Sequence, residues 1–116
     1  MSSEKSKERK IKTEFNKLKK IFANVPENKK KITENLLKNA AFMAVSLVEL
    51  QEEINQNGYT DEYRNGEFQF GKKQSEAVKT HLAMQKNYVQ VIDKLLELLP
   101  EDERKQSRLA AFRNEA

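Results

Sequence analysis

The segment that decides the fold lies between two long helix-like stretches and reads Asn57-Gly58-Tyr59-Thr60-Asp61-Glu62-Tyr63-Arg64-Asn65-Gly66-Glu67-Phe68-Gln69-Phe70-Gly71-Lys72-Lys73-Gln74-Ser75. All three glycines of the chain are in it, and we expect each to supply the positive φ that tight turns need. The flanking stretches are nearly free of helix breakers, so the chain can reverse direction only here and near its two prolines. The aromatic residues of the segment predict a loop that packs against the protein.

Apolar residues recur every three or four positions on both sides of this loop, which indicates amphipathic helices. The first predicted helix runs from Lys7 to Ala23, after a disordered start at residues 2–6. A second runs from Pro26 to Asn57 with Gly58 as its C-terminal cap, and a third from the N-cap Ser75 to Leu99. Pro100 ends the third helix and opens a short fourth one. The predicted fold class is all-α, with two long antiparallel helices forming a hairpin, a basic amphipathic helix before it and a short C-terminal helix after it.

A chain of 116 residues has the length of one domain, which we divide into three segments. Residues 1–31 form a basic N-terminal segment, residues 32–99 the central hairpin, and residues 100–116 a tail that binds a partner. The first ten residues lack the apolar core of a secretory signal, and no apolar run is long enough to span a bilayer. Because cysteine is also absent, we expect a soluble, cytoplasmic protein without disulfides or membrane contact.

The charge of the chain is concentrated at its front. Residues 1–31 hold eleven of the 22 basic residues and four of the 18 acidic ones, a net charge of +7, whereas the remainder is net −3. A segment this basic attracts polyanions, and contacts with phosphates require only charge and reach. The predicted DNA-contacting residues are Lys7, Arg9, Lys10, Lys12, Lys17, Lys19, Lys20, Lys29, Lys30 and Lys31, with Lys5 nearby. A solvated charged face is the alternative interpretation.

The second predicted helix contains a stretch, Ala40 to Val48, that is apolar on every side. A helix of this kind must be covered all round, and one neighbouring helix cannot do that. We therefore expect a homo-oligomer, although a closed three-helix bundle is the alternative. The predicted interface residues are Leu36, Leu37, Ala40, Met43, Ala44, Val45, Leu47, Val48, Leu82, Val89, Ile92 and Leu96.

Signatures of catalysis and of metal binding are missing from the sequence. With no cysteine and with His81 as the only histidine, neither a Cys-His pair nor a histidine-rich metal site can be assembled. The stretch from Gly66 to Lys73 imitates a phosphate-binding loop but lacks the Ser or Thr after the lysine and a strand before it, so we interpret it as a turn. The clustered Glu49, Glu52 and Glu53 are interpreted as a solvated face. We expect no catalytic residue, no metal and no cofactor.

The order of these features resembles the small subunit of tailed-phage terminases over roughly residues 36–112. The matching positions are Gly58, Asn65, Gly66, Gly71 and the Leu98-Leu99-Pro100 ending. The resemblance implies a phage DNA-packaging adaptor that is not an enzyme, in which residues 7–31 bind viral DNA, residues 36–99 assemble and residues 100–116 meet the large terminase subunit. It also implies the cytoplasm of a bacterial host cell. Many members carry a three-helix DNA-binding unit at the N-terminus, whereas one helix and a turn stand here, so we expect DNA to be held largely through phosphates.

Two other functions are compatible with the sequence. One is a helical protein-interaction module without DNA binding, for which the basic front would be dispensable. The other is an enzyme of helical fold, which is disfavoured because no nucleophile and base can be paired.

Overall fold

The computed structural model describes residues 2–64, 66–67 and 69–102. Within them lie three helices, α1 (Ser2–Ile21), α2 (Lys30–Asn57) and α3 (Glu76–Leu98), and a 3-10 turn, η1 (Glu27–Lys29). Two strands, β1 (Thr60–Arg64) and β2 (Phe70–Gln74), connect α2 to α3. The protein is therefore mostly helical, and the all-α prediction was wrong in omitting the small sheet.

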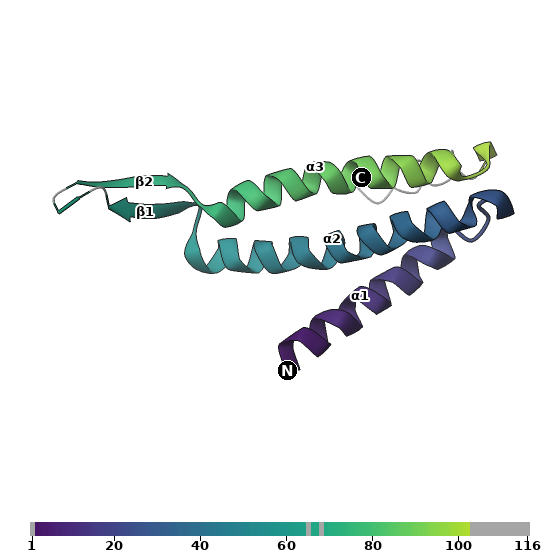
Figure 1. Cartoon of the computed structure of the whole chain (residues 1–116), viewed down its shortest axis with the longest axis horizontal. Coiled ribbons are helices and arrows are strands. Elements are labelled where there is room, and N and C mark those ends of the chain that lie inside the picture. The colour runs from purple at the N-terminus through teal and green to yellow at the C-terminus, as the bar shows by residue number, and fades with distance from the viewer. Residues whose placement is uncertain (1, 65, 68, 103–116) are drawn as a thin grey trace, which may run out of the picture.

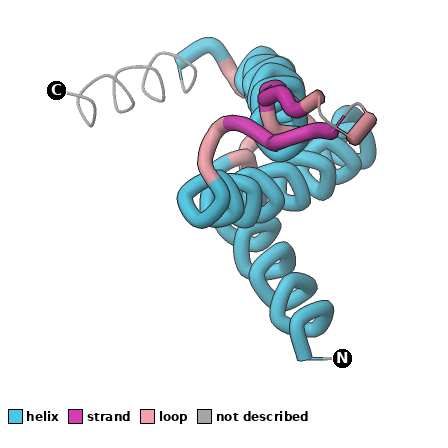
Figure 2. The backbone as a smooth tube through the Cα atoms, turned by 90° about the vertical axis from the view of Figure 1, so that its left-hand side faces the viewer, coloured by secondary structure: helices cyan, strands magenta, loops and turns pink. Residues whose placement is uncertain are grey.

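The helices form an elongated body rather than a compact bundle. Helices α2 and α3 lie side by side and run in opposite directions, while α1 joins α2 at one end and leans away from it toward the N-terminus (Figure 1, Figure 2). The longest axis measures 62 Å and the shortest 26 Å. The leaning of α1 leaves its outer surface and one side of α2 uncovered.

The core lies at the end of the molecule where all three helices converge. Leu95 of α3 is completely buried against Ala40 and Ala41 of α2, which are also fully buried. Alanines at this contact permit the two helices to approach closely. The core is completed by Leu18, Phe22, Val25, Leu37 and Leu99.

Two predicted helix caps are confirmed. Ser75 is the N-cap of α3, and its Oγ accepts a hydrogen bond of 3.0 Å from the backbone N–H of Val78. Gly58 ends α2 with φ +82°, and its N–H donates to the carbonyl of Ile54 at 2.7 Å. Positive φ at this position is the conformation that glycine adopts at little cost.

Other helix bounds differ from the prediction. The first helix begins at Ser2 and ends at Ile21, so the prediction of disorder before Lys7 was wrong. Pro26 does not open α2, because its backbone is extended (ψ 144°) and a 3-10 turn intervenes before α2 starts at Lys30. Leu99 is also extended, so α3 ends one residue earlier than predicted. Of the predicted C-terminal segment, residues 103–116 lie outside the described residues, and Glu101 and Asp102 are helical.

The loop that we expected to pack on the protein instead forms a two-stranded ribbon that projects past the helices (Figure 1). Its antiparallel register runs from Thr60 opposite Gln74 to Arg64 opposite Phe70. Tyr59 and Phe70 are 74% and 72% exposed, so the packing predicted for these two aromatics was wrong.

The glycines of the ribbon do two different things. Gly66 has φ +93° in the turn, as expected, whereas Gly71 does not have positive φ, so that prediction was wrong. Gly71 lies opposite Tyr63 in the register, and a Cβ there would come within 3.0 Å of the Tyr63 ring. Glycine at position 71 therefore makes room for the cross-strand tyrosine.

Candidate nucleic-acid interface

The outer half of α1 is a cationic surface without acidic residues. With about 3.6 residues per turn, the half of the helix that carries the core residues Ile11, Phe15 and Leu18 also carries all three of its acids. The opposite half, here called the outer face, carries exposed cations and uncharged polar groups. Its cations are Lys5, Arg9, Lys10, Lys12, Lys17 and Lys20.

The positions of the acids Glu4, Glu8 and Glu14 support this division. Glu14 lies close enough to Tyr88 of α3 that its charge, after burial as the larger cause, raises the pKa of the tyrosine hydroxyl. Its carboxylate therefore faces inward. Glu8 stands at the margin of the outer face, in a shallow depression with Lys5, Arg9 and Lys12. The cations between Lys5 and Lys20 extend over about 22 Å of helix, at 1.5 Å per residue.

Lys7, one of the ten predicted DNA contacts, is occupied within the chain. Its Nζ lies 2.7 Å from Oε1 of Glu49 and 4.9 Å from the centre of the Phe42 ring, both on α2. The side chain points toward α2, on the half of α1 that carries the core residues. Lys7 thus holds the leaning end of α1 to α2, and the outer face stays free.

Lys19 and Lys30 come together where α1 meets α2. Both line a hollow of about 390 Å³ that also contains Phe22, Thr33 and Leu37. Lys19 lies 5.9 Å from the Phe15 ring centre, and Lys30 pairs with Glu27 at 3.0 Å. Lys29 and Lys31 are exposed beside them. The predicted cations therefore fall into three groups: the outer face, the junction, and the internally bound Lys7.

The twelve predicted interface residues divide by exposure. Leu37, Ala40 and Leu47 are at most 8% exposed, so they pack within the chain and have little surface for a second copy. Ile92, Leu96 and Leu36 also pack against the core. Met43, Ala44 and Val45 are half-buried. The exposed members are Val48 (53%), Leu82 (59%) and Val89 (50%).

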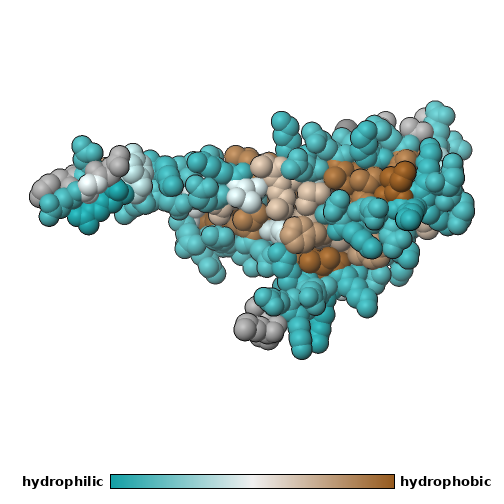
Figure 3. Space-filling model, viewed as in Figure 1, coloured by the Kyte–Doolittle hydropathy of each residue, from teal (hydrophilic) through white to brown (hydrophobic). Residues whose placement is uncertain are grey.

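These three exposed residues lie along one open side of the α2–α3 seam. Leu82 shares a hollow with Gln51, Val48 stands one turn before Gln51, and Val89 stands two turns after Leu82. On the face seen in Figure 3, apolar side chains likewise gather along the seam between hydrophilic margins. Apolar surface of this kind, with hydrophilic edges, is typical of a surface that another protein covers.

Sequence reasoning missed Phe42, which is 48% exposed beside Lys7, and the exposed aromatics of the ribbon. The available signal for the ribbon was Gly66 within the short stretch between Arg64 and Phe70, because two strand-like runs joined by up to five residues that include a glycine are typical of a hairpin.

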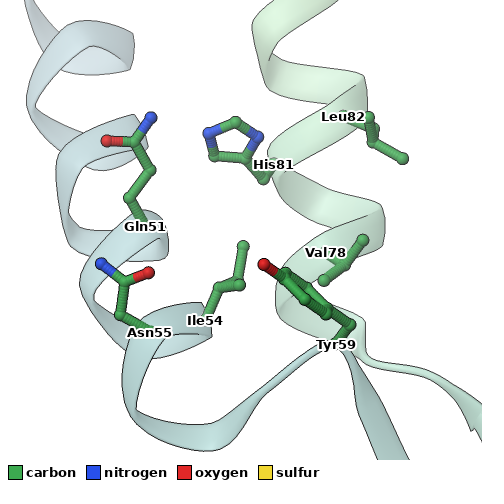
Figure 4. A pocket seen from close by; sticks show the side chains of 7 residues that line it. All are labelled: Gln51, Ile54, Asn55, Tyr59, Val78, His81 and Leu82. Atoms are coloured by element: carbon green, nitrogen blue, oxygen red, sulfur yellow. The ribbon is translucent and has the colours of Figure 1, made fainter.

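His81 lies between the C-terminal part of α2 and the N-terminal part of α3. It lines a hollow of about 250 Å³ together with Gln51, Asn55 and Tyr59 (Figure 4). Its Nε2 is buried and has no hydrogen-bond partner among the described residues. The residues that line this hollow include amides, a phenol and aliphatic groups but no carboxylate. His81 is therefore a seam residue with no carboxylate among the residues that line its hollow.

Within residues 2–64, 66–67 and 69–102, acidic and histidine side chains do not gather in groups of three that would suit a metal ion. In the same residues, every helix is too short or too polar to cross a membrane. Comparison with protein-family models, characterised proteins and solved structures finds no match to this chain.

Proposed function

We propose that this protein is a DNA-binding adaptor that is not an enzyme and acts as an oligomer, in the manner of a terminase small subunit. In this role it binds viral DNA and passes it to a large terminase subunit in the cytoplasm of a bacterial host. The support for DNA binding is physical, whereas the packaging role rests on the sequence resemblance alone.

The observation that carries the proposal is the outer face of α1. Six of the eight cations of α1 lie on its outer half, whereas its three acids lie on the half that carries the core residues, so positive charge is in excess on the exposed half. The duplex presents one negative charge per about 1.7 Å of its length, and the outer face opposes it with cations on one exposed helix. Ser6, Thr13 and Asn16 on the same half add polar groups of the kind that bond phosphates, although the Thr13 hydroxyl also donates to the Arg9 carbonyl at 2.9 Å.

Assembly is the second part of the proposal. The antiparallel pair of α2 and α3 is the unit that assembles, and the open side with Val48, Leu82 and Val89 is the surface that another copy covers. Residues 100–116 are proposed to contact the large subunit, following the resemblance.

Neutralising the outer face tests DNA binding. In the variant Arg9→Gln/Lys20→Gln we expect weaker binding of duplex DNA, and a plot of log affinity against log salt whose slope falls by about two, one per lost phosphate contact. Both residues are exposed, so folding should be unaffected. The measurement is fluorescence anisotropy with labelled duplex between low and physiological salt.

The matched control is Lys86→Gln/Lys94→Gln, which removes the same charge from exposed positions of α3. If the control weakens binding and lowers the slope as much as the α1 variant does, only the net charge matters and the outer face is not the DNA site.

A helical protein-interaction module is the second candidate, and the exposed apolar side of the seam favours it. It predicts that the α1 variant retains its partner or its oligomeric state while duplex DNA is not bound even by the wild type at low salt. Truncation of α1 cannot make this distinction, because Leu18 and Phe22 belong to the core.

A further inference from the structure

The ribbon stands clear of the helical body, and among the described residues the contacts that anchor it lie at its base, where Lys73 Nζ is 3.6 Å from Oε1 of Glu76. The backbone N–H of Ser75 donates to the Tyr59 carbonyl at 2.9 Å, and the N–H of Glu76 donates to Oδ2 of Asp61 at 3.2 Å. Beyond this point, four of the five residues in each strand are exposed. The described part of the chain therefore leaves most of the ribbon to solvent.

An isolated two-stranded ribbon is only marginally stable in water. Each strand here pairs on one edge alone within the described residues, so each outer edge presents unused backbone N–H and C=O groups. The exposed rings of Tyr59 and Phe70 add apolar surface at its two ends. These features are typical of a sheet that another strand completes.

The two strands carry opposite charges. Strand β1 contains the acids Asp61 and Glu62, whereas β2 contains Lys72 and Lys73. Inside the chain the register places Asp61 opposite Lys73 and Glu62 opposite Lys72. One free edge of the ribbon is thus acidic in its middle and the other basic.

We propose that the ribbon pairs edge to edge with the ribbon of a second copy, with β2 of one chain antiparallel to β1 of the next. This arrangement repeats at each contact the internal register, in which the acids lie opposite the lysines. Pairing of β1 with β1 in a register centred on Asp61 and Glu62 would oppose acids to acids, and pairing of β2 with β2 centred on Lys72 and Lys73 would oppose lysines to lysines. Like charges opposite one another are destabilising. The charge pattern therefore selects a head-to-tail contact.

A head-to-tail contact uses two different surfaces on every copy. It leaves a free edge at each end, so copies are added until a ring closes or a filament extends, and a two-fold dimer is not formed. The inference concerns assembly through the ribbon and does not depend on DNA binding by α1.

Cross-linking through single cysteines tests the pairing in the full-length protein. The chain has no cysteine, so Glu62→Cys and Lys72→Cys each introduce a unique thiol. Opposite residues of antiparallel strands have Cα atoms about 4.5–5.5 Å apart, which suits a disulfide. After mild oxidation of an equimolar mixture of the two variants, we expect covalent dimers on a non-reducing gel, and none in either variant alone.

A mixture of Glu62→Cys with Lys86→Cys, whose thiol lies on α3, measures the dimer yield from random collision. Circular dichroism checks that every variant keeps its helical content. The pair Thr60→Cys and Gln74→Cys, which are exposed and opposite in the internal register, repeats the test two residues along. A dimer yield above the collision level in a single-variant sample would overturn the inference in favour of like-edge pairing. A yield at the collision level in both mixtures would overturn it altogether, while anisotropy with duplex DNA would still report independently on the proposed function.

Discussion

Lys7 and Arg9 are two residues apart in α1 and have different roles. A separation of two residues turns about 200° around a helix, which places the two side chains on opposite halves. Lys7 reaches Glu49 and Phe42 of α2, and Arg9 remains exposed on the outer face. Because the Lys7 and Glu49 side chains are 32% and 48% exposed, their ion pair contributes at most about 1 kcal/mol. Its role is to position α1 more than to stabilise the fold.

Tyr88 reports on the contact between α1 and α3. Burial, and then the charge of Glu14, raise its pKa above the ordinary 10.0. A tyrosine is neutral when protonated, so the folded state holds this proton more firmly than the unfolded state does. The resulting stability is fully present below pH 10 and is lost as the pH rises through the raised pKa.

Replacing Glu14 with Gln removes the negative charge that helps to raise the pKa of Tyr88, but it leaves the tyrosine buried. We therefore expect the pKa of Tyr88 in Glu14→Gln to fall toward 10.0 without reaching it. Carbon-13 NMR titration of the Tyr88 ring separates this group from Tyr59 and Tyr63, and Glu8→Gln is the control. An unchanged pKa in Glu14→Gln would mean that Glu14 points away from α3, which would weaken the division of α1 into two halves.

At the scale of elements, the cap of α3 determines where the ribbon ends and the helix begins. Ser75 is 4% exposed, its hydroxyl accepts from Val78, and its own N–H bonds Tyr59 at the base of the ribbon. The serine side chain therefore satisfies an amide that would otherwise lack a partner in the first turn.

Removing this hydroxyl should destabilise the protein. We expect Ser75→Ala to lower the free energy of unfolding by about 1 kcal/mol, the usual cost of losing an N-cap. Urea denaturation followed by circular dichroism measures it. Ser75→Thr, which keeps the hydroxyl, should retain most of the stability. Equal losses in both variants would indicate that packing around the buried residue, and not the cap, is responsible.

The sequence predicted the helices far better than the connection between them. Apolar spacing located α2 and α3 because each buries a stripe along its length, and Ser75 and Gly58 signal their ends through side-chain capping and positive φ. The prediction that Pro26 opens the second helix was wrong because the fixed φ of proline suits both a helix start and an extended residue. Here ψ is 144°, so Pro26 is extended. The ribbon was missed because its exposed faces lack the alternation of apolar and polar residues that a half-buried strand shows.

The site was predictable in composition but not in geometry. The concentration of cations in the N-terminal segment is evident from the sequence. The ion pair between Lys7 and Glu49, however, depends on the angle between α1 and α2. Apolar spacing does not determine that angle. Val48 is 53% exposed although its neighbour Leu47 is buried, because adjacent residues of a helix point about 100° apart.

At the scale of the whole molecule, the described part of the chain leaves apolar surface exposed. Val48, Leu82 and Val89 are each at least half exposed, and the ribbon adds Tyr59 and Phe70. Burial of such surface yields roughly 25 cal/mol per Å². Association of copies would remove it from water along the seam and complete the sheet at the ribbon.

Solution mass by size-exclusion chromatography with multi-angle light scattering tests this claim most directly. If copies cover this apolar surface and pair through the ribbon, the wild-type particle has at least three times the 13.5 kDa chain mass. It also predicts that Val48→Glu/Leu82→Glu, changed only at exposed positions, gives a smaller mass with its helical content retained. Ile32→Glu, at a position 61% exposed on α2 outside the predicted interface, is the control. A stable, folded wild-type particle of 13.5 kDa across the concentration range would contradict the account.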